Sequence, residues 1–346
     1  MTTSGAFVCL VLLLVAASCT TSSVSAAPTA NSQGIVDCFA QILAASLTRL
    51  SLNNDYVCTL SKNGVLLANG DMGTDAFNAF GPNHGFPLLQ SEDAAFFESY
   101  YGTPTDGFVA VARVNITSNS GIGYYMTNAT QRVSYFLDEF GQLTGELNAV
   151  QEYVPTSRIW YQGALNSTSG SYVTATPYRF SLNSLRVTAS RQCISTPRTR
   201  DLQVIAGADI TLDVLSEVAL TSAKCPLFNA AQGVVFVVNA DGVLLMQNGA
   251  GVTGVAEATA SAGLVGAAAR HAKTQNGADW YGQAVAATFT YADNEYEVVT
   301  YPVSSSLTAS VDISAWGWTV VSVQRTSGLC GTSSAASSLL PFRFFM

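Results

Sequence analysis

Three hairpin signals constrain the fold of this chain most strongly. Each consists of an apolar run, a polar turn containing glycine, and a second apolar run. They are YVCTLSKNGVLLANG from residue 56, VSYFLDEFGQLTG from residue 133 and VVFVVNADGVLLMQNG from residue 234. Few strand-like segments are separated by a crossover helix, which disfavours a doubly wound parallel sheet. The sequence therefore predicts an α+β protein built on antiparallel sheets.

A diverged internal repeat divides the chain into two modules. The first and third hairpin signals share the letters GVLL and a trailing Asn-Gly, and RIWYQGA at residues 158–164 returns as ADWYGQA at residues 278–284. Both Trp-Tyr segments precede strand-like stretches rich in Thr, Val and Tyr. We predict one module over residues 28–225 and a second over residues 226–326.

A long helix is expected ahead of the first strands. Residues 34–52 read GIVDCFAQILAASLTRLSL and place Ile35, Phe39, Ile42 and Leu50 at helical spacing. A helix of about five turns fits this segment, and its apolar stripe would pack against a module.

The first 27 residues are expected to be a signal peptide. An apolar run at residues 6–18 is too short to span a membrane, and Val24-Ser25-Ala26 resembles a cleavage site. No basic residue precedes the run, and a rival interpretation is a lipoprotein with a lipidated Cys19. We expect no membrane span in the mature chain, and a flexible tail at residues 327–346.

Three Asn-x-Ser/Thr sequons point to the same secretory route. They lie at Asn115, Asn128 and Asn166. Each alone is a weak signal, but together with the leader they predict a secreted or extracellular glycoprotein.

The cysteines predict disulfides rather than a metal site. Removal of the leader leaves five, at residues 38, 58, 193, 225 and 330. They show no C-x-x-C spacing and no nearby histidine, so we expect no bound metal. In an oxidising compartment we predict local pairing, Cys193 with Cys225 first and Cys38 with Cys58 next.

Composition and motifs argue against several classes of function. The net charge of −8 and the lack of a basic run disfavour nucleic acid or an anionic membrane as a partner. Only two histidines are present, and no nucleophile elbow accompanies them, so we predict no enzyme and no cofactor. The GAGVTG segment at residues 249–254 has dinucleotide-binding spacing but follows a hairpin strand, so it is not a Rossmann turn.

One segment has the chemistry of a ligand site. In YVPTSRIWYQGAL at residues 153–165, Arg158 offers a fork of donors that matches a carboxylate, and aromatic side chains surround it. Asp209, at the end of the apolar strand LQVIAGAD, is able to hold an ammonium group. This set matches the two charges of an amino-acid zwitterion. A structural Arg158–Asp209 salt bridge among core aromatics is the alternative.

These residues resemble the double Cache (dCache) extracellular sensor domains. The resemblance rests on the motif Tyr153-x4-Arg158-x-Trp160-Tyr161, on a TPY ending at Tyr178, and on LQVIAGADITLDVLSEV with Asp209. More narrowly, the motif is similar to that of the amino-acid-binding dCache subfamily. The resemblance implies two PAS-like Cache modules after a long N-terminal helix, the ligand pocket being in the membrane-distal module, residues 28–225, and not in the membrane-proximal module, residues 226–326.

The resemblance also implies roles for these residues. Arg158 and Trp160 would hold the ligand carboxylate, and Asp209 with the tyrosines at positions 153, 161 and 178 would hold the amino group. Tyr172 competes with Tyr178 for its place. The second module has Ala278 where Arg158 stands in the first, and therefore lacks the carboxylate clamp. The alternative function is a secreted structural or cell-surface glycoprotein whose Cache fold has lost ligand binding.

Overall fold

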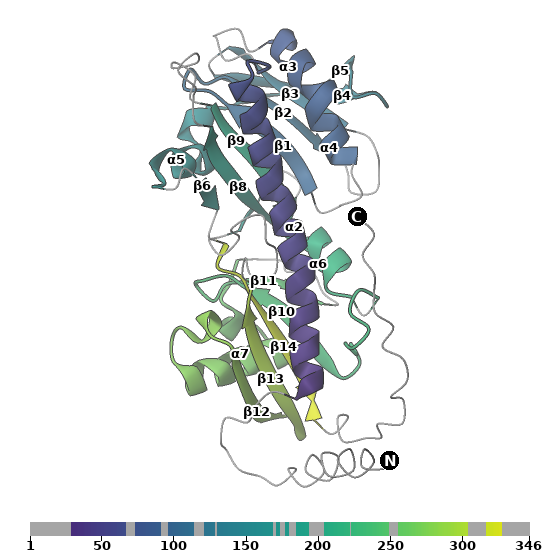
Figure 1. Ribbon diagram of the computed structural model, residues 1–346, viewed down its shortest axis with the longest axis vertical. Helices are drawn as coiled ribbons and strands as arrows, with labels where there is room; N and C mark the ends of the chain where they lie inside the picture. The colour runs from purple at the N-terminus through teal and green to yellow at the C-terminus, as the bar shows by residue number, and fades with distance from the viewer. Residues whose placement is uncertain are drawn as a thin grey trace, which may run out of the picture.

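A long helix and two antiparallel sheets make up the protein in a computed structural model (Figure 1). The structure describes residues 29–66, 73–90, 96–113, 121–128, 130–168, 171–173, 177–179, 185–193, 204–221, 223–248, 255–303 and 316–326. The leader, Asn115, Cys330, the GAGVTG segment and the tail predicted from the sequence lie outside the described residues.

The first sheet contains nine strands in the described part of the chain. They are β1 (Phe96–Gly102), β2 (Phe108–Arg113), β3 (Gly121–Asn128), β4 (Gln131–Leu137), β5 (Leu143–Glu152), β6 (Ser171–Val173), β7 (Tyr178–Arg179), β8 (Leu185–Cys193) and β9 (Val204–Thr211). Their order is β5-β4-β3-β2-β1-β9-β8-β6, and β7 also pairs with β8. Every pair in this sheet is antiparallel, as the hairpin signals predict.

The second sheet has five described strands in the order β11-β10-β14-β13-β12. Its strands are β10 (Gly233–Val238), β11 (Leu244–Gln247), β12 (Val285–Tyr291), β13 (Asn294–Pro302) and β14 (Thr319–Arg325). They too pair only antiparallel. The two sheets confirm the predicted α+β class.

Short helices cover the sheets and connect the strands. They are α3 (Thr74–Phe80), η1 (Gly81–Gly85), α4 (Phe86–Gln90), η2 (Pro155–Ser157), α5 (Ile159–Asn166), α6 (Leu212–Ala219), η3 (Ala258–Ala260), α7 (Gly263–Asn276) and η4 (Trp280–Gly282). In the first sheet, α3 and η1 pack against β2 and β3, and α5 packs against β8.

Helix α2 (Ala30–Lys62) runs along both sheets and shares one hydrophobic cluster with them, and the second sheet has a further cluster of its own (Figure 1). It packs against β13 and β14 of the second sheet and against β8 and β9 of the first. By length and composition this helix passes the test for a membrane span, but half of its most apolar window is buried inside the fold. The buried Glu297 of β13 accepts hydrogen bonds from Thr29 N and Ser32 Oγ at the N-terminus of the helix. A carboxylate at this position also complements the helix dipole.

The helix is much longer than the five turns that the sequence predicts. It has 33 residues and extends through the first hairpin signal, so a hairpin at residue 56 is wrong. The Asn-Gly pair of that signal ends the helix instead. Gly64 adopts φ +70°, its N–H donates to Ser61 O, and the Val65 N–H donates to Leu60 O. These two bonds form a Schellman cap, which requires the same left-handed glycine as a tight hairpin turn. The signals at residues 133 and 234 are confirmed as β4–β5 and β10–β11.

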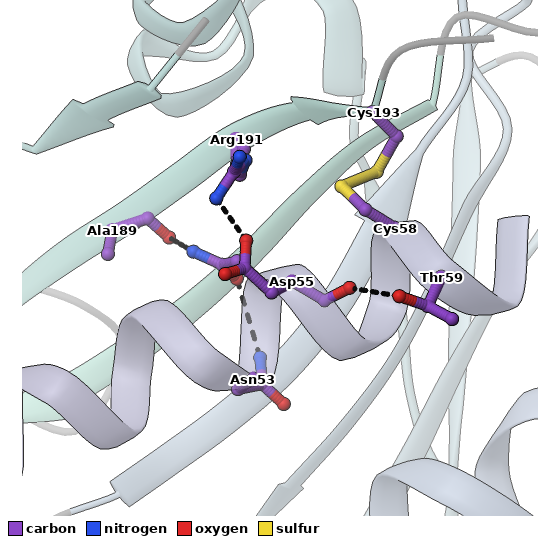
Figure 2. The surroundings of a disulfide bond; sticks show 8 residues. Asn53, Asp55, Cys58, Thr59, Ala189, Arg191 and Cys193 are labelled. Atoms are coloured by element: carbon purple, nitrogen blue, oxygen red, sulfur yellow. Dashed lines mark hydrogen bonds and ion pairs between the residues drawn. A yellow bond between two sulfur atoms is a disulfide. The ribbon is translucent and has the colours of Figure 1, made fainter. Parts of the chain in front are cut away.

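The predicted disulfide partners are wrong, although the four cysteines are the right ones. Cys38 pairs with Cys225 and Cys58 pairs with Cys193, with Cα–Cα distances of 6.1 Å and 4.8 Å. Cys38 and Cys58 lie on one continuous helix, about 30 Å apart at 1.5 Å per residue, and are far outside disulfide range. Both bridges instead fasten α2 to later parts of the chain. Figure 2 shows Cys58–Cys193 next to the Asp55–Arg191 ion pair, and both of these interactions join α2 to β8.

Non-reducing peptide mapping is expected to recover these two long-range bridges. The fragments should contain Cys38 linked to Cys225 and Cys58 linked to Cys193, because helix α2 keeps its own two cysteines apart. A fragment linking Cys38 to Cys58 would contradict the uninterrupted helix.

Two of the three sequon asparagines lie in described segments. Asn128 is exposed where β3 ends, and Asn166 is exposed at the last residue of α5. Exposure is what a glycosyltransferase requires, and glycosylation itself stays a prediction.

Candidate ligand-binding site

Strand pairing brings two carboxylates together on one face of the first sheet. In an antiparallel sheet, residues directly opposite each other point to the same face. The register pairs Glu98 of β1 with Asp209 of β9, and Asp209 with Thr188 of β8. The neighbouring Ser99 points to the other face, where its hydroxyl donates to Asn53 of α2 at 3.0 Å. The face opposite α2 therefore carries the polar site.

Asp209 is the best-connected group of the site. Its Oδ1 accepts hydrogen bonds from Tyr100 Oη at 2.9 Å and Thr188 Oγ1 at 2.7 Å, and its Oδ2 accepts one from Tyr178 Oη at 3.0 Å. Only 3% of Asp209 is exposed. Burial raises the pKa of Asp209, while the Arg186 guanidinium and the three hydroxyls act in the opposite direction. The carboxylate is thus held by three hydroxyl donors, with the Arg186 guanidinium 3.9 Å away.

Gly207 makes room for one of these donors. A Cβ at this position would lie 2.1 Å from the Tyr100 ring. Only glycine therefore lets Tyr100 lie across β9 so that its hydroxyl reaches Asp209.

An aromatic wall stands beside the carboxylates. The Trp160 ring centre is 4.9 Å from that of Tyr100, and the Tyr153 ring centre is 4.9 Å from that of Phe108. The Trp160 Nε1–H donates to Tyr153 Oη at 3.2 Å. Because β5 ends at Glu152 and α5 begins at Ile159, the short η2 turn between them places Tyr153 and Trp160 on the same side of the sheet.

Arg158 lies at the rim of this wall. It is the N-cap residue of α5 and is exposed, and its guanidinium carbon is 4.5 Å from the centre of the Tyr153 ring. Among the described residues it makes no ion pair, and the guanidinium beside Asp209 is that of Arg186, at 3.9 Å. The alternative of a structural Arg158–Asp209 salt bridge is therefore wrong.

The structure separates the candidate tyrosines. Tyr178 Oη contacts both Asp209 Oδ2 and Thr188 Oγ1, the latter at 2.6 Å. Tyr172 instead packs against Gly163, where a Cβ would be 2.4 Å from its ring, and lines a shallow groove along α5. Tyr161 is 2% exposed and stacks edge-on against Trp160. The structure thus brings Tyr153, Trp160, Tyr178 and Asp209 together, and leaves Tyr161 in the core.

The sequence-based prediction of the site did not include three of its charged residues. Glu98, Arg132 and Arg186 are each at most 4% exposed and belong to strands on the same face. The Arg186 Nη1 atom lies 3.7 Å from Glu98 Oε2 and 3.9 Å from Asp209 Oδ2. A lone charged residue inside an apolar strand, such as Glu98 in AAFFESYYG, was an available signal. Charged side chains are rarely buried unless they are paired or functional.

The carboxyl group of Glu98 has fewer described hydrogen-bond partners than that of Asp209. Burial and, after it, the charge of Asp209 raise the pKa of Glu98 to about 7, against the lowering effect of Arg186 and Arg132. No described residue donates a hydrogen bond to its carboxylate, in contrast to Asp209. A proton on Glu98 removes the repulsion between the two neighbouring carboxylates.

We expect this proton to make stability depend on pH. The folded-state pKa of Glu98 is about 7 against an ordinary 4.5, so the folded protein binds the proton more tightly than the unfolded chain. The unfolding free energy should therefore fall as the pH rises from 4.5 to about 7. Chemical denaturation across this range measures the slope. Glu98→Gln should flatten it, and an equal slope in the variant would contradict the assignment.

Comparison with known proteins supports the fold. No protein-family model and no curated protein matches the sequence. The periplasmic sensory domain of the Campylobacter jejuni chemoreceptor Tlp1 superposes with a TM-score of 0.52 at 10% identity, over 86% of this chain and 94% of that one. This likeness confirms the double Cache fold, with its long helix and two sheets.

Two further solved structures resemble the chain less well. The ligand-binding domain of Pseudomonas aeruginosa PctB with L-Arg gives a TM-score of 0.48 at 13% identity, covering 87% of this chain and 95% of that one. The ligand-binding domain of Campylobacter jejuni Tlp3 with L-norvaline gives 0.49 at 13% identity, covering 88% and 94%.

Proposed function

We propose that the chain is an extracellular sensor domain that binds one free L-amino acid in its first module. The observation that carries the proposal is Asp209, a buried carboxylate surrounded by three hydroxyl donors beside an aromatic wall. Asp209, Tyr153 and Tyr178 bind the α-amino group, and Arg158 and Trp160 bind the α-carboxylate.

The ammonium group of a zwitterion complements the two buried carboxylates, and its carboxylate complements Arg158. An ammonium group beside Asp209 and Glu98 adds the positive charge that stabilises two ionised carboxylates in a buried place. Arg158 presents its planar fork at the rim, unpaired with any described carboxylate, and a bidentate contact to the α-carboxylate satisfies it. A ligand of this size reaches micromolar affinity, about −8 kcal/mol, when most of its atoms are buried.

The second module is proposed to have no part in binding. Ala278 takes the place of Arg158 there and is exposed, while Trp280 of η4 is 2% exposed and packs in the core of the second sheet. The carboxylate clamp is therefore limited to the first module.

The leader and the sequons support secretion, with glycosylation on one or more of the three asparagines. A secreted structural or cell-surface glycoprotein without a ligand is the second candidate, since a buried cluster of charges also occurs in purely structural cores.

A thermal-shift screen of the secreted protein against the common L-amino acids tests the proposal. Any ligand that binds the folded state raises the melting temperature by mass action. The matching D-enantiomers are the control, because the two charged contacts and the aromatic wall together distinguish the two enantiomers. The absence of a shift with every L-amino acid at millimolar concentration would favour the structural glycoprotein.

A further inference from the structure

Arg132 is a buried guanidinium on the binding face that the motif does not include. It lies on β4 and belongs to the binding face through its pairing with β3. Only 4% of the residue is exposed. Its guanidinium carbon is 4.4 Å from the centre of the Tyr153 ring and 4.7 Å from that of Tyr124. Aromatic faces thus hold the cation in place.

The described surroundings of Arg132 provide no carboxylate in direct contact, and its charge acts on Glu98 only at longer range, where it lowers the pKa of that carboxyl. Within the described segments its guanidinium donates one hydrogen bond, to Gln151 Oε1, and has no carboxylate at ion-pair distance. Arg186 on the same face differs, because it lies beside both Glu98 and Asp209. A buried cation without an ion-pair partner is costly unless an anion joins it.

The charges of the site point to the kind of anion. Three guanidinium groups, those of Arg132, Arg158 and Arg186, face two carboxylates, those of Glu98 and Asp209. The excess is one positive charge when both carboxylates are ionised. A zwitterion with a neutral side chain leaves that excess unchanged, whereas an amino acid with a second carboxylate removes it.

The geometry places two guanidinium groups within reach of one small ligand. Arg132 and Arg158 both lie within 4.5 Å of the centre of the same Tyr153 ring. Strands β3 and β2 lie between Arg132 on β4 and Glu98 on β1, and on this face they carry Tyr124 and Phe108 as well as the small side chains of Ala110 and Ala112. The small side chain of Ala112 lies next to Glu98, whereas the aromatic rings of Phe108 and Tyr124 lie next to Arg132.

We propose that Arg132 binds the side-chain carboxylate of a dicarboxylic amino acid, so that the site selects L-glutamate or L-aspartate over neutral amino acids. This inference rests on the proposed function, since it assumes that Arg158 and Asp209 hold the α-carboxylate and the α-amino group. Arg132 is then the specificity-determining residue. A ligand with a neutral side chain leaves the charge of Arg132 uncompensated in the complex. Arg132 therefore disfavours neutral amino acids as well as favouring acidic ones.

Titration calorimetry on the full secreted protein tests the inference with matched ligand pairs. L-Glutamate or L-aspartate is expected to bind about 10- to 100-fold more tightly than the corresponding amide, as for a hydrogen bond between charged groups. Arg132→Gln should remove this preference, with a loss confined to the acidic ligand. Arg191→Gln is the control, because Arg191 is an exposed arginine of β8 whose partner is Asp55 on α2.

The outcomes separate this inference from the proposed function. If no amino acid binds the wild-type protein, the proposed function fails and the inference fails with it. If amino acids bind but the amide binds as tightly as the acid, only the inference is overturned, and this comparison needs no variant. If Arg132→Gln weakens acid and amide equally, Arg132 holds the α-carboxylate, which also overturns the inference. Arg132→Lys, which keeps the charge, should retain part of the preference if Arg132→Gln does not fold.

Discussion

Arg158→Ala is expected to weaken amino-acid binding by about 2–4 kcal/mol, because the ligand carboxylate loses its bidentate partner inside the site. The unfolding free energy should stay unchanged. Arg158 is exposed, caps α5 through its backbone alone and makes no ion pair within the described residues. Calorimetry of the variant with the best ligand from the thermal-shift screen gives the change directly.

Arg158→Lys and a change in the second module complete this test. Lysine keeps the charge but not the planar fork, so it should restore only part of the affinity. Tyr281→Phe alters the Trp-Tyr pair of the second module and should leave binding intact. An Arg158→Ala protein that folds normally and binds with unchanged affinity would show that the arginine has no part in recognition.

The local patterns in the sequence were enough to predict the fold class. Two of three hairpin signals are hairpins because their polar turns connect runs with strand composition. The signal at residue 56 is not a hairpin, because Asn-Gly at residues 63 and 64 also caps a helix, and local sequence does not distinguish the two uses of a left-handed glycine. The helix length then decided the cysteine partners, since a continuous α2 separates Cys38 from Cys58.

The site was predictable only where its residues share a segment or a motif. Tyr153, Arg158 and Trp160 follow one another along the chain, so their proximity can be read directly. Glu98 and Asp209 are brought together by the register of β1 and β9, two strands far apart in the sequence. No local pattern specifies which distant strands pair or which residues then face each other. For the same reason, the sequence does not reveal that Arg132 and Arg186 belong to the site.

Asp209→Asn is expected to weaken amino-acid binding by about 3 kcal/mol or more, because the ligand ammonium loses its charged partner in a buried place. Folding should not suffer. Burial raises the pKa of Asp209, so the folded state disfavours its charge, and a neutral side chain of the same size removes that cost. The unfolding free energy at neutral pH is therefore expected to hold or rise while the affinity falls.

The effect on Glu98 distinguishes this explanation from a general disturbance of the site. The charge of Asp209 is one of the causes that raise the pKa of Glu98, so Asp209→Asn should bring that pKa down from about 7. The pH dependence of stability between 4.5 and 7 should shrink accordingly. Thr188→Val is a suitable comparison, because it removes one donor to Asp209 and keeps the charge. If Asp209→Asn lowers the unfolding free energy strongly and still binds amino acids, Asp209 is a structural residue and the ammonium site lies elsewhere.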